Sequence, residues 1–310
     1  MAFTTGTASN HNDLLDKLRA YLVTQGWTAD DYTAGVAATD VAFLALTGPG
    51  SLGGEQPKVS IQTAFNTGIN AYGWQVGAYP QYDDTLPFGL QILNSPLAYL
   101  LLWDGTMDYW IYANDRRFIL IAKIGTHYMS LYAGFFLPYG LPAEYPFPYY
   151  VGASYLELAP YNLNNAGVRS FADPGTNAAF YMRRSSSDWG SLRNSSQGVN
   201  LIDSYSDHDG AIIWPYRCFS VQGQTDIPAE TAWSYFQRMR PLANGRMPMW
   251  QCTIMDSIDR SVQGVLDGVY ATSGFGRVPE QVVTADAQDY RLFISASKDT
   301  PKHYFAVEEI

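Results

Sequence analysis

The densest group of potential metal ligands in this 310-residue sequence is a segment that holds Asp203, Asp207, His208 and Asp209 and ends in Gly210. Carboxylate oxygens followed by glycine suit a calcium loop, but the spacing differs from that of an EF-hand and no bidentate glutamate follows. A single histidine among carboxylates is also an incomplete ligand set for zinc. Aspartate is common in turns because its side chain bonds to its own backbone. We therefore interpret the segment as a solvated turn and expect no bound metal.

A second pattern, Gly48-Pro49-Gly50-Ser51-Leu52-Gly53, formally matches the glycine sequence of dinucleotide-binding proteins and follows an apolar strand. A nucleotide site also needs a helix that begins there and presents its N-terminus to the pyrophosphate. Here Gly54-Glu55-Gln56-Pro57 leads into an alternating, strand-like segment instead. The pattern predicts a tight turn between strands, and no cofactor is expected.

Paired carboxylates in aromatic surroundings are the catalytic alternative that stays open. Two acids drawn from Asp83, Asp84, Glu144 and Glu157 could serve a glycosidase, with aromatic rings stacked on the sugar. Any acidic protein offers such pairs, so the pattern is weak. No G-x-S-x-G nucleophile motif is present, and we predict that the chain is not an enzyme. The remaining histidines and the cysteines are scattered and indicate no catalytic group: His11, His127, His303, Cys218 and Cys252.

The composition favours assembly or binding. Aromatic residues and charged residues each make up 15% of the chain, whereas soluble domains carry about 25% charged residues. The net charge of −10, with no basic run, argues against a nucleic-acid partner. No apolar window is long enough to span a membrane, and the first residues lack the pattern of a secretory signal.

Local patterns predict one helix and a series of strands. Asn10 or Asn12 can cap the helix, Leu14, Leu18 and Leu22 share one face, and Gly26 can end it. We expect this helix to come before any strand. Alternation and apolar runs then predict strands, with a hairpin turn at 113–116 and a segment, 128–136, that is also compatible with a helix. The expected strands are 41–46, 58–65, 73–79, 109–112, 117–123, 211–214, 265–271, 290–296 and 304–307.

Short strands joined by Gly, Pro and Asp turns indicate a mainly β fold of antiparallel β-sandwich-like domains with one N-terminal α-helix. Prolines between Leu137 and Pro148 suggest a break in the chain. We accordingly expect an N-terminal helix at 1–30, a first β domain at 31–150 and a second β-rich, loop-heavy domain at 151–310.

Several segments resemble a family of virion structural proteins of tailed bacteriophages. The opening from Phe3 to Arg19, which runs on to Gly26-Trp27, is similar to the start of that family, as are the turn at 48–54 and the segments Arg116-Arg117-Phe118-Ile119, 266–270 and 273–276. The resemblance covers most of the chain and implies a particle component, in the tail or baseplate, with no catalytic residues. It also implies assembly in the bacterial host cytoplasm and residence in the virion.

On this basis we expect a structural joint that contacts other tail or baseplate proteins and copies of itself, with closed rings as the usual solution. The alternatives are a receptor- or glycan-binding module and, with less support, a glycan hydrolase. For each candidate contact, packing within the chain's own domain stays open as the other interpretation. The candidate interface residues are Leu14, Leu18 and Leu22 of the helix, and Tyr139, Tyr145, Phe147, Tyr149 and Tyr150 of a proline-rich aromatic loop.

Overall fold

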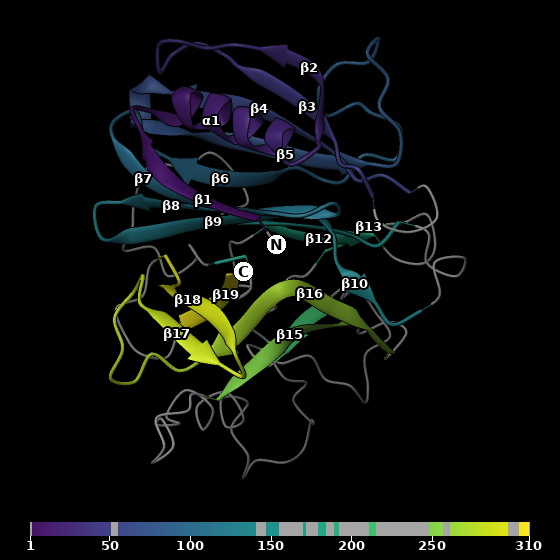
Figure 1. Ribbon diagram of the computed structural model, residues 1–310. Helices are drawn as coiled ribbons and strands as arrows, with labels where there is room; N and C mark the ends of the chain where they lie inside the picture. The colour runs from purple at the N-terminus through teal and green to yellow at the C-terminus, as the bar shows by residue number, and fades with distance from the viewer. Residues whose placement is uncertain are drawn as a thin grey trace, which may run out of the picture.

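The computed structural model describes residues 2–50, 55–140, 147–154, 170–171, 179–183, 189–191, 211–214, 248–256, 261–296 and 304–309. These residues form three antiparallel β-sheets, one α-helix and a short 3-10 turn, η1 (Thr67–Ile69). The mainly β, sandwich-like class that the sequence predicts is confirmed. The three sheets are stacked as layers, with one sheet in the middle (Figure 1).

The central sheet is built from segments that are far apart in the sequence. Its first strand, β1, pairs antiparallel with β7 from Ala2–Ala113 to Ala8–Met107. The strand therefore precedes the helix, and the expectation that the helix comes first is wrong. In spatial order the sheet holds β1 (Ala2–Ala8), β7 (Met107–Ala113), β8 (Arg117–Ile124), β9 (His127–Phe135), β11 (Tyr149–Ala153), β12 (Ala179–Arg183) and β13 (Trp189–Ser191).

The N-terminal sheet covers one face of the central sheet. Its strands follow one another along the chain and pair as neighbours, so the residues after β3 lead into a strand that lies antiparallel to it. The glycine-rich segment therefore connects two adjacent strands, whereas a dinucleotide-binding turn connects a strand to a helix. The sheet holds β2 (Thr28–Thr33), β3 (Phe43–Thr47), β4 (Lys58–Asn66), β5 (Ala71–Tyr79) and β6 (Ala98–Leu102).

The C-terminal sheet covers the opposite face of the central sheet. A two-residue strand, β10 (Leu137–Pro138), joins it by pairing with β16 before the chain returns to the central sheet at β11. In spatial order the remaining strands are β14 (Ala211–Trp214), β15 (Met249–Asp256), β16 (Ser261–Thr272), β19 (Tyr304–Glu309), β18 (Gln288–Ile294) and β17 (Val282–Ala285).

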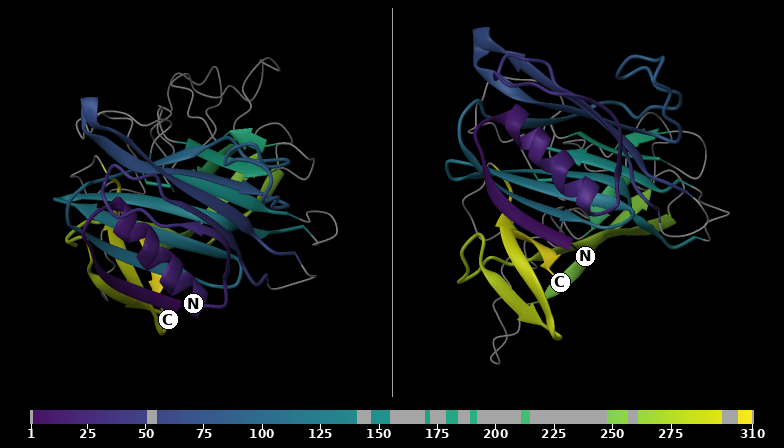
Figure 2. Two further views of the ribbon diagram at one scale, coloured as in Figure 1. Left: turned by 90° about the horizontal axis from the view of Figure 1, so that it is seen from above. Right: turned by 45° about the horizontal axis from the view of Figure 1, so that its top comes forward.

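Helix α1 (His11–Thr24) links β1 to β2 and packs against both of these edge strands. The Asn10 side chain caps it by accepting from the N–H groups of Asn12 and Asp13. The helix ends at Thr24, and Gly26 follows with a left-handed backbone (φ +86°) that glycine adopts at little cost. Two further views show α1 lying along the side of the sandwich, beside β1 (Figure 2).

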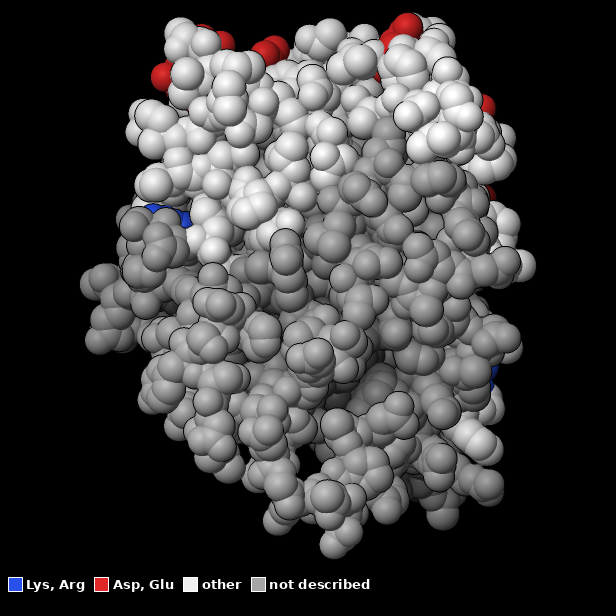
Figure 3. All heavy atoms as spheres, turned by 180° about the vertical axis from the view of Figure 1, so that it is seen from behind, with Lys and Arg blue, Asp and Glu red and all other residues white. Residues whose placement is uncertain are grey.

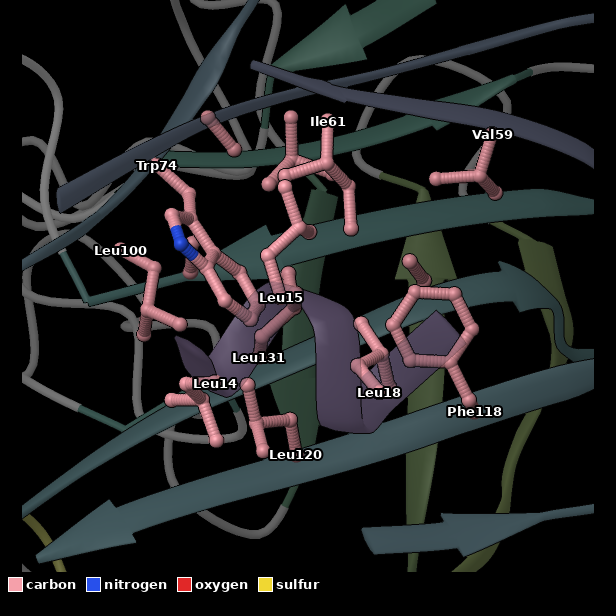
Figure 4. Packing of buried hydrophobic residues seen from close by; sticks show 14 of the residues in the cluster. Leu14, Leu15, Leu18, Val59, Ile61, Trp74, Leu100, Phe118, Leu120 and Leu131 are labelled. Atoms are coloured by element: carbon pink, nitrogen blue, oxygen red, sulfur yellow. The ribbon is translucent and has the colours of Figure 1, made fainter. Parts of the chain in front are cut away.

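Because the central sheet is covered on both faces, the protein has two hydrophobic cores. The first joins α1, the N-terminal sheet and the central sheet, and the close view shows Leu18 beside Phe118 and Leu14 beside Leu120 (Figure 4). The second lies between the central and C-terminal sheets and is rich in aromatic rings, such as Trp110 against Phe293 with centroids 5.4 Å apart.

Neighbouring residues of one central strand serve different cores, since side chains alternate across a strand. Ile111 belongs to the first core and Tyr112 to the second. Many of the chain's aromatic residues are consumed in this way: the largest fully buried side chains include Trp74, Tyr79, Tyr112, Tyr132, Tyr149, Tyr150, Phe118, Phe136, Phe171, Phe180 and Phe293. The aromatic excess therefore serves the protein's own interior first.

The expected division at 1–30, 31–150 and 151–310 does not separate these layers. The central sheet takes β1 from the first range and β7, β8 and β9 from the second. It takes β12 and β13 from the third range, and β11 crosses the boundary between the second and the third. The three ranges are thus hydrogen-bonded into one sheet.

Candidate interaction surface

The described residues include no group of three or more His, Cys, Asp or Glu side chains placed to hold a metal ion. Several residues with candidate chemistry lie outside the described part of the chain. These are Asp203, Asp207, His208, Asp209 and Gly210 of the metal-like turn, Glu144 and Glu157 of the glycosidase hypothesis, and Cys218 and His303.

Two of the remaining candidates, His11 and Cys252, are buried. The ring of His11 lies against Tyr72 with centroids 5.5 Å apart, and burial lowers the pKa of His11 to about 4. Its backbone carbonyl accepts a hydrogen bond from the Trp74 indole at 3.0 Å. Burial raises the pKa of the Cys252 thiol, which disfavours the reactive thiolate. Both side chains are structural.

The three helical leucines proposed as a docking stripe face inward. Leu14, Leu18 and Leu22 have no exposed surface and belong to the first core. The helix contacts β1, at the edge of the central sheet, and β2, at the edge of the N-terminal sheet. Its apolar stripe therefore faces the space between these two sheets. In this structure a partner cannot contact these side chains, and packing within the chain, the alternative interpretation, accounts for them.

Tyr149 and Tyr150 of the aromatic loop are buried as well. They are consecutive residues of β11, so they point into opposite cores. The Tyr149 hydroxyl donates to the carbonyl of Tyr79 and accepts from the N–H of Lys58, both at 2.7 Å, and thereby ties the central sheet to the N-terminal sheet. Their proposed role as contacts to a neighbour is not met, because both are completely enclosed.

The other candidates of that loop are placed differently. Phe147 is half-buried, with its ring stacked on Tyr149 at 6.3 Å and the Arg183 guanidinium 5.0 Å from its centroid. Tyr139 is 65% exposed and is therefore open to a partner. Tyr145 lies outside the described residues.

Two segments that are far apart in the sequence, 116–119 and 266–270, meet between the central and C-terminal sheets. Arg116 and Arg117 of the β7–β8 hairpin lie 3.3 Å and 3.5 Å from the carboxylate of Asp267 on β16. The Asn114 amide also donates to that carboxylate at 2.6 Å. Arg117 is fully buried and Asp267 is nearly so, and the cluster acts as an internal joint between the two sheets.

A further charged contact fastens the same two layers. Glu280, which precedes β17, accepts from Lys123 at 2.6 Å and from the Tyr128 hydroxyl at 2.5 Å. Burial works against ionisation of Glu280, but these hydrogen bonds and the charge of Lys123 outweigh it and lower its pKa. Like the Asp267 cluster, this contact is structural.

The 80–97 loop, between β5 and β6, is the best candidate for an interaction surface. It has no helix or strand, and loops of such length without regular structure are uncommon unless they have a role. It packs on the outer face of the N-terminal sheet: Tyr82 stacks on Tyr79 at 5.9 Å, and Phe88 contacts Phe43 at 6.1 Å. The backbone N–H of Ala78 donates to the Ser95 hydroxyl at 3.0 Å.

A buried glutamine holds the 80–97 loop in shape. Gln91 is 5% exposed. Its side chain accepts from the N–H of Asp83 at 2.8 Å and donates to the carbonyls of Asp83 and Leu86 at 2.9 Å and 3.0 Å. The acidic turn at Asp83 is thus joined directly to the residues around Gln91.

The side chains on either side of Gln91 point outward. Leu90, Ile92 and Leu93, called the loop tip below, are 68%, 53% and 47% exposed. Leu93 has a left-handed backbone (φ +56°), which is costly for a non-glycine residue and is found where surroundings enforce it. Its carbonyl accepts a hydrogen bond from the Trp189 indole at 2.8 Å. The tip is therefore a prearranged apolar surface.

Acidic residues gather on the same side of the protein. Residues 28–102, which run from the first to the last strand of the N-terminal sheet, contain six acidic residues and one basic residue, Lys58. Seen from behind, carboxylates line the top of the described surface, over the N-terminal sheet, and basic atoms are visible only lower down (Figure 3). The Tyr82 hydroxyl of the loop donates to Asp31 at 3.4 Å, and partial burial together with the carboxylates of Asp31, Asp30 and Asp84 raises the pKa of Tyr82 to about 12.

In this loop the sequence indicates only Asp83 and Asp84 as candidates, for catalytic acids, and it does not predict the exposed tip. A signal was present: three aliphatic residues stand between Gly89 and Asn94 in a segment otherwise rich in turn formers. Aliphatic side chains in such a segment can pack against the chain's own sheet or face the solvent, and the sequence alone does not distinguish these two arrangements.

None of the helices among the described residues is long and apolar enough to cross a membrane. No family model matches the chain, and no curated protein matches it significantly.

Proposed function

We propose that the chain is a structural component of a tailed-phage particle, in the tail or baseplate, where it joins neighbouring subunits. The observation that carries the proposal is the loop tip, a fixed apolar surface on the outside of a body whose other large apolar side chains are mostly enclosed. Fixed apolar anchors are the usual centres of protein interfaces. The resemblance of the Arg116–Ile119 and 266–270 segments to phage virion proteins supports the same conclusion.

The charged residues also fit a mechanical role. The cluster of Asp267 with Arg116 and Arg117, and the contact of Glu280 with Lys123, are used to fasten one layer to the next. A joint that transmits force needs layers that do not slide, and hydrogen-bonded ion pairs resist such displacement.

A glycan-binding role has less support. Sugar recognition would use an exposed aromatic platform, whereas the exposed large apolar side chains among the described residues are aliphatic except for Tyr139 and Phe275.

Mass spectrometry and electron microscopy of the native particle test the proposal. We expect the chain in purified particles, with its density repeated around the tail axis in a closed ring of copies. Recovery of the chain only outside particles, as a monomer, would refute it.

A further inference from the structure

We propose that the loop tip docks a positively charged segment of another protein, whose apolar side chains cover Leu90, Ile92 and Leu93 and whose Lys or Arg residues meet the surrounding carboxylates. The inference rests on the proposed function and names the chemistry of one neighbour.

The loop tip is a fixed apolar surface. Three aliphatic side chains stand outward on a backbone that Gln91 and the Trp189 indole hold in place. Because the loop is ordered before binding, little conformational entropy is lost when a partner covers it. The tip is small, so its partner must also use contacts around it.

Acidic side chains lie beside the 80–97 loop. Asp30, Asp31 and Asp84 are exposed, and none of them forms an ion pair with the residues that the structure describes. Tyr82 ties this group to the loop by donating to Asp31 at 3.4 Å. These carboxylates, which have no ion-pair partner among the described residues, match a partner that carries basic residues around its own apolar contact. Such matching of charge speeds the encounter of the two surfaces and disfavours acidic partners.

A second copy of the chain docked through the same surface is disfavoured. A two-fold dimer places each patch against itself, so the carboxylates of one copy would face those of the other. Lys58, the one basic residue between the start of β2 and the end of β6, does not balance them. The occupant is therefore a different protein surface.

The test uses the purified full chain and two fluorescent amphipathic peptides with the same leucine pattern, one carrying lysines and the other glutamates. We expect the lysine peptide to bind and the glutamate peptide not to bind. Raising salt from about 0.05 M to about 0.5 M should weaken the binding strongly, since the Debye length falls below the spacing of exposed charges.

Matched variants locate the site. Ile92→Ser should weaken lysine-peptide binding about tenfold, as expected for an anchor in an interface, and so should Asp31→Asn combined with Asp84→Asn. Asp286→Asn with Asp289→Asn removes the same charge at the distant β17–β18 turn and should leave binding unchanged. Thermal melting confirms that each variant is folded.

Equal binding of both peptides, failure of the lysine peptide to bind, or an equal loss of binding in the control variant would overturn the inference. So would a change of oligomeric state in Ile92→Ser, because it would make a second copy the occupant. These outcomes are independent of whether the chain is found in the particle.

Discussion

Replacing Tyr149 by Phe should lower the free energy of unfolding, because it removes one buried hydroxyl and nothing else. The hydroxyl is completely enclosed and bonds at 2.7 Å to both the Tyr79 carbonyl and the Lys58 N–H. Phenylalanine would leave this N–H buried without that acceptor, which costs about 2 to 3 kcal/mol. For a chain of this size the melting temperature should fall by roughly 5 °C.

Urea unfolding of the isolated chain, followed by tryptophan fluorescence, measures the effect. Tyr139→Phe is the matched control, since it makes the same chemical change at a side chain that is 65% exposed, and it should alter stability by less than about 0.5 kcal/mol. If Tyr149→Phe were as stable as the parent, the hydroxyl would not tie the two sheets together, and Tyr149 would again be a candidate for contact with a neighbour.

Three other changes probe the joints and the loop. Asp267→Asn should cost about 3 kcal/mol of stability, because it removes the carboxylate beside the buried charge of Arg117. His11→Phe should reduce the loss of stability in acid. In the unfolded chain His11 binds a proton below its ordinary pKa of 6.5, whereas in the folded chain it binds one only near pH 4. The stability that is present above pH 6.5 therefore falls by about 3 kcal/mol as the pH drops to 4, and the variant should not show this fall. Gln91→Ala should increase hydrogen exchange at the amide of Asp83, which donates to the Gln91 side chain.

Each of these changes has its own control. Asp286→Asn, at an exposed turn position with φ +50°, should be nearly neutral, and an equal cost at both sites would argue against the buried ion pair. His127→Phe should retain the acid sensitivity of the parent. If His11→Phe retained it too, the buried histidine would not be its source. Gln25→Ala should leave exchange in the 80–97 loop unchanged, whereas unchanged exchange in Gln91→Ala would show that the glutamine does not hold the loop.

Local signals were sufficient for many of the elements. Asn10 followed by an apolar stripe predicts α1, and the alternation at 58–65 and the turn at 113–116 predict β4 and the β7–β8 hairpin. In these segments the residues that determine the structure are neighbours in the sequence. The segment at 128–136 was ambiguous because both faces of β9 are buried, and a strand without a polar face loses its alternation.

Long-range pairing decided what local signals could not. β1 is a strand because β7 supplies its hydrogen-bond partners from residues about a hundred positions away. The ion pairs of Asp267 likewise form only once β16 has packed on the central sheet. The sequence could identify the two motifs but not their contact.

The sequence by itself determined the mainly β class, the helix and the abundance of aromatic residues. Which face each apolar side chain meets was decided only by the tertiary structure. Leu18 and Tyr149 became core residues because a sheet lies over each of them, whereas Ile92 remained exposed because no described residue covers its side chain. Burial depends on which surfaces meet in three dimensions, and residue type sets only the free energy gained when they do.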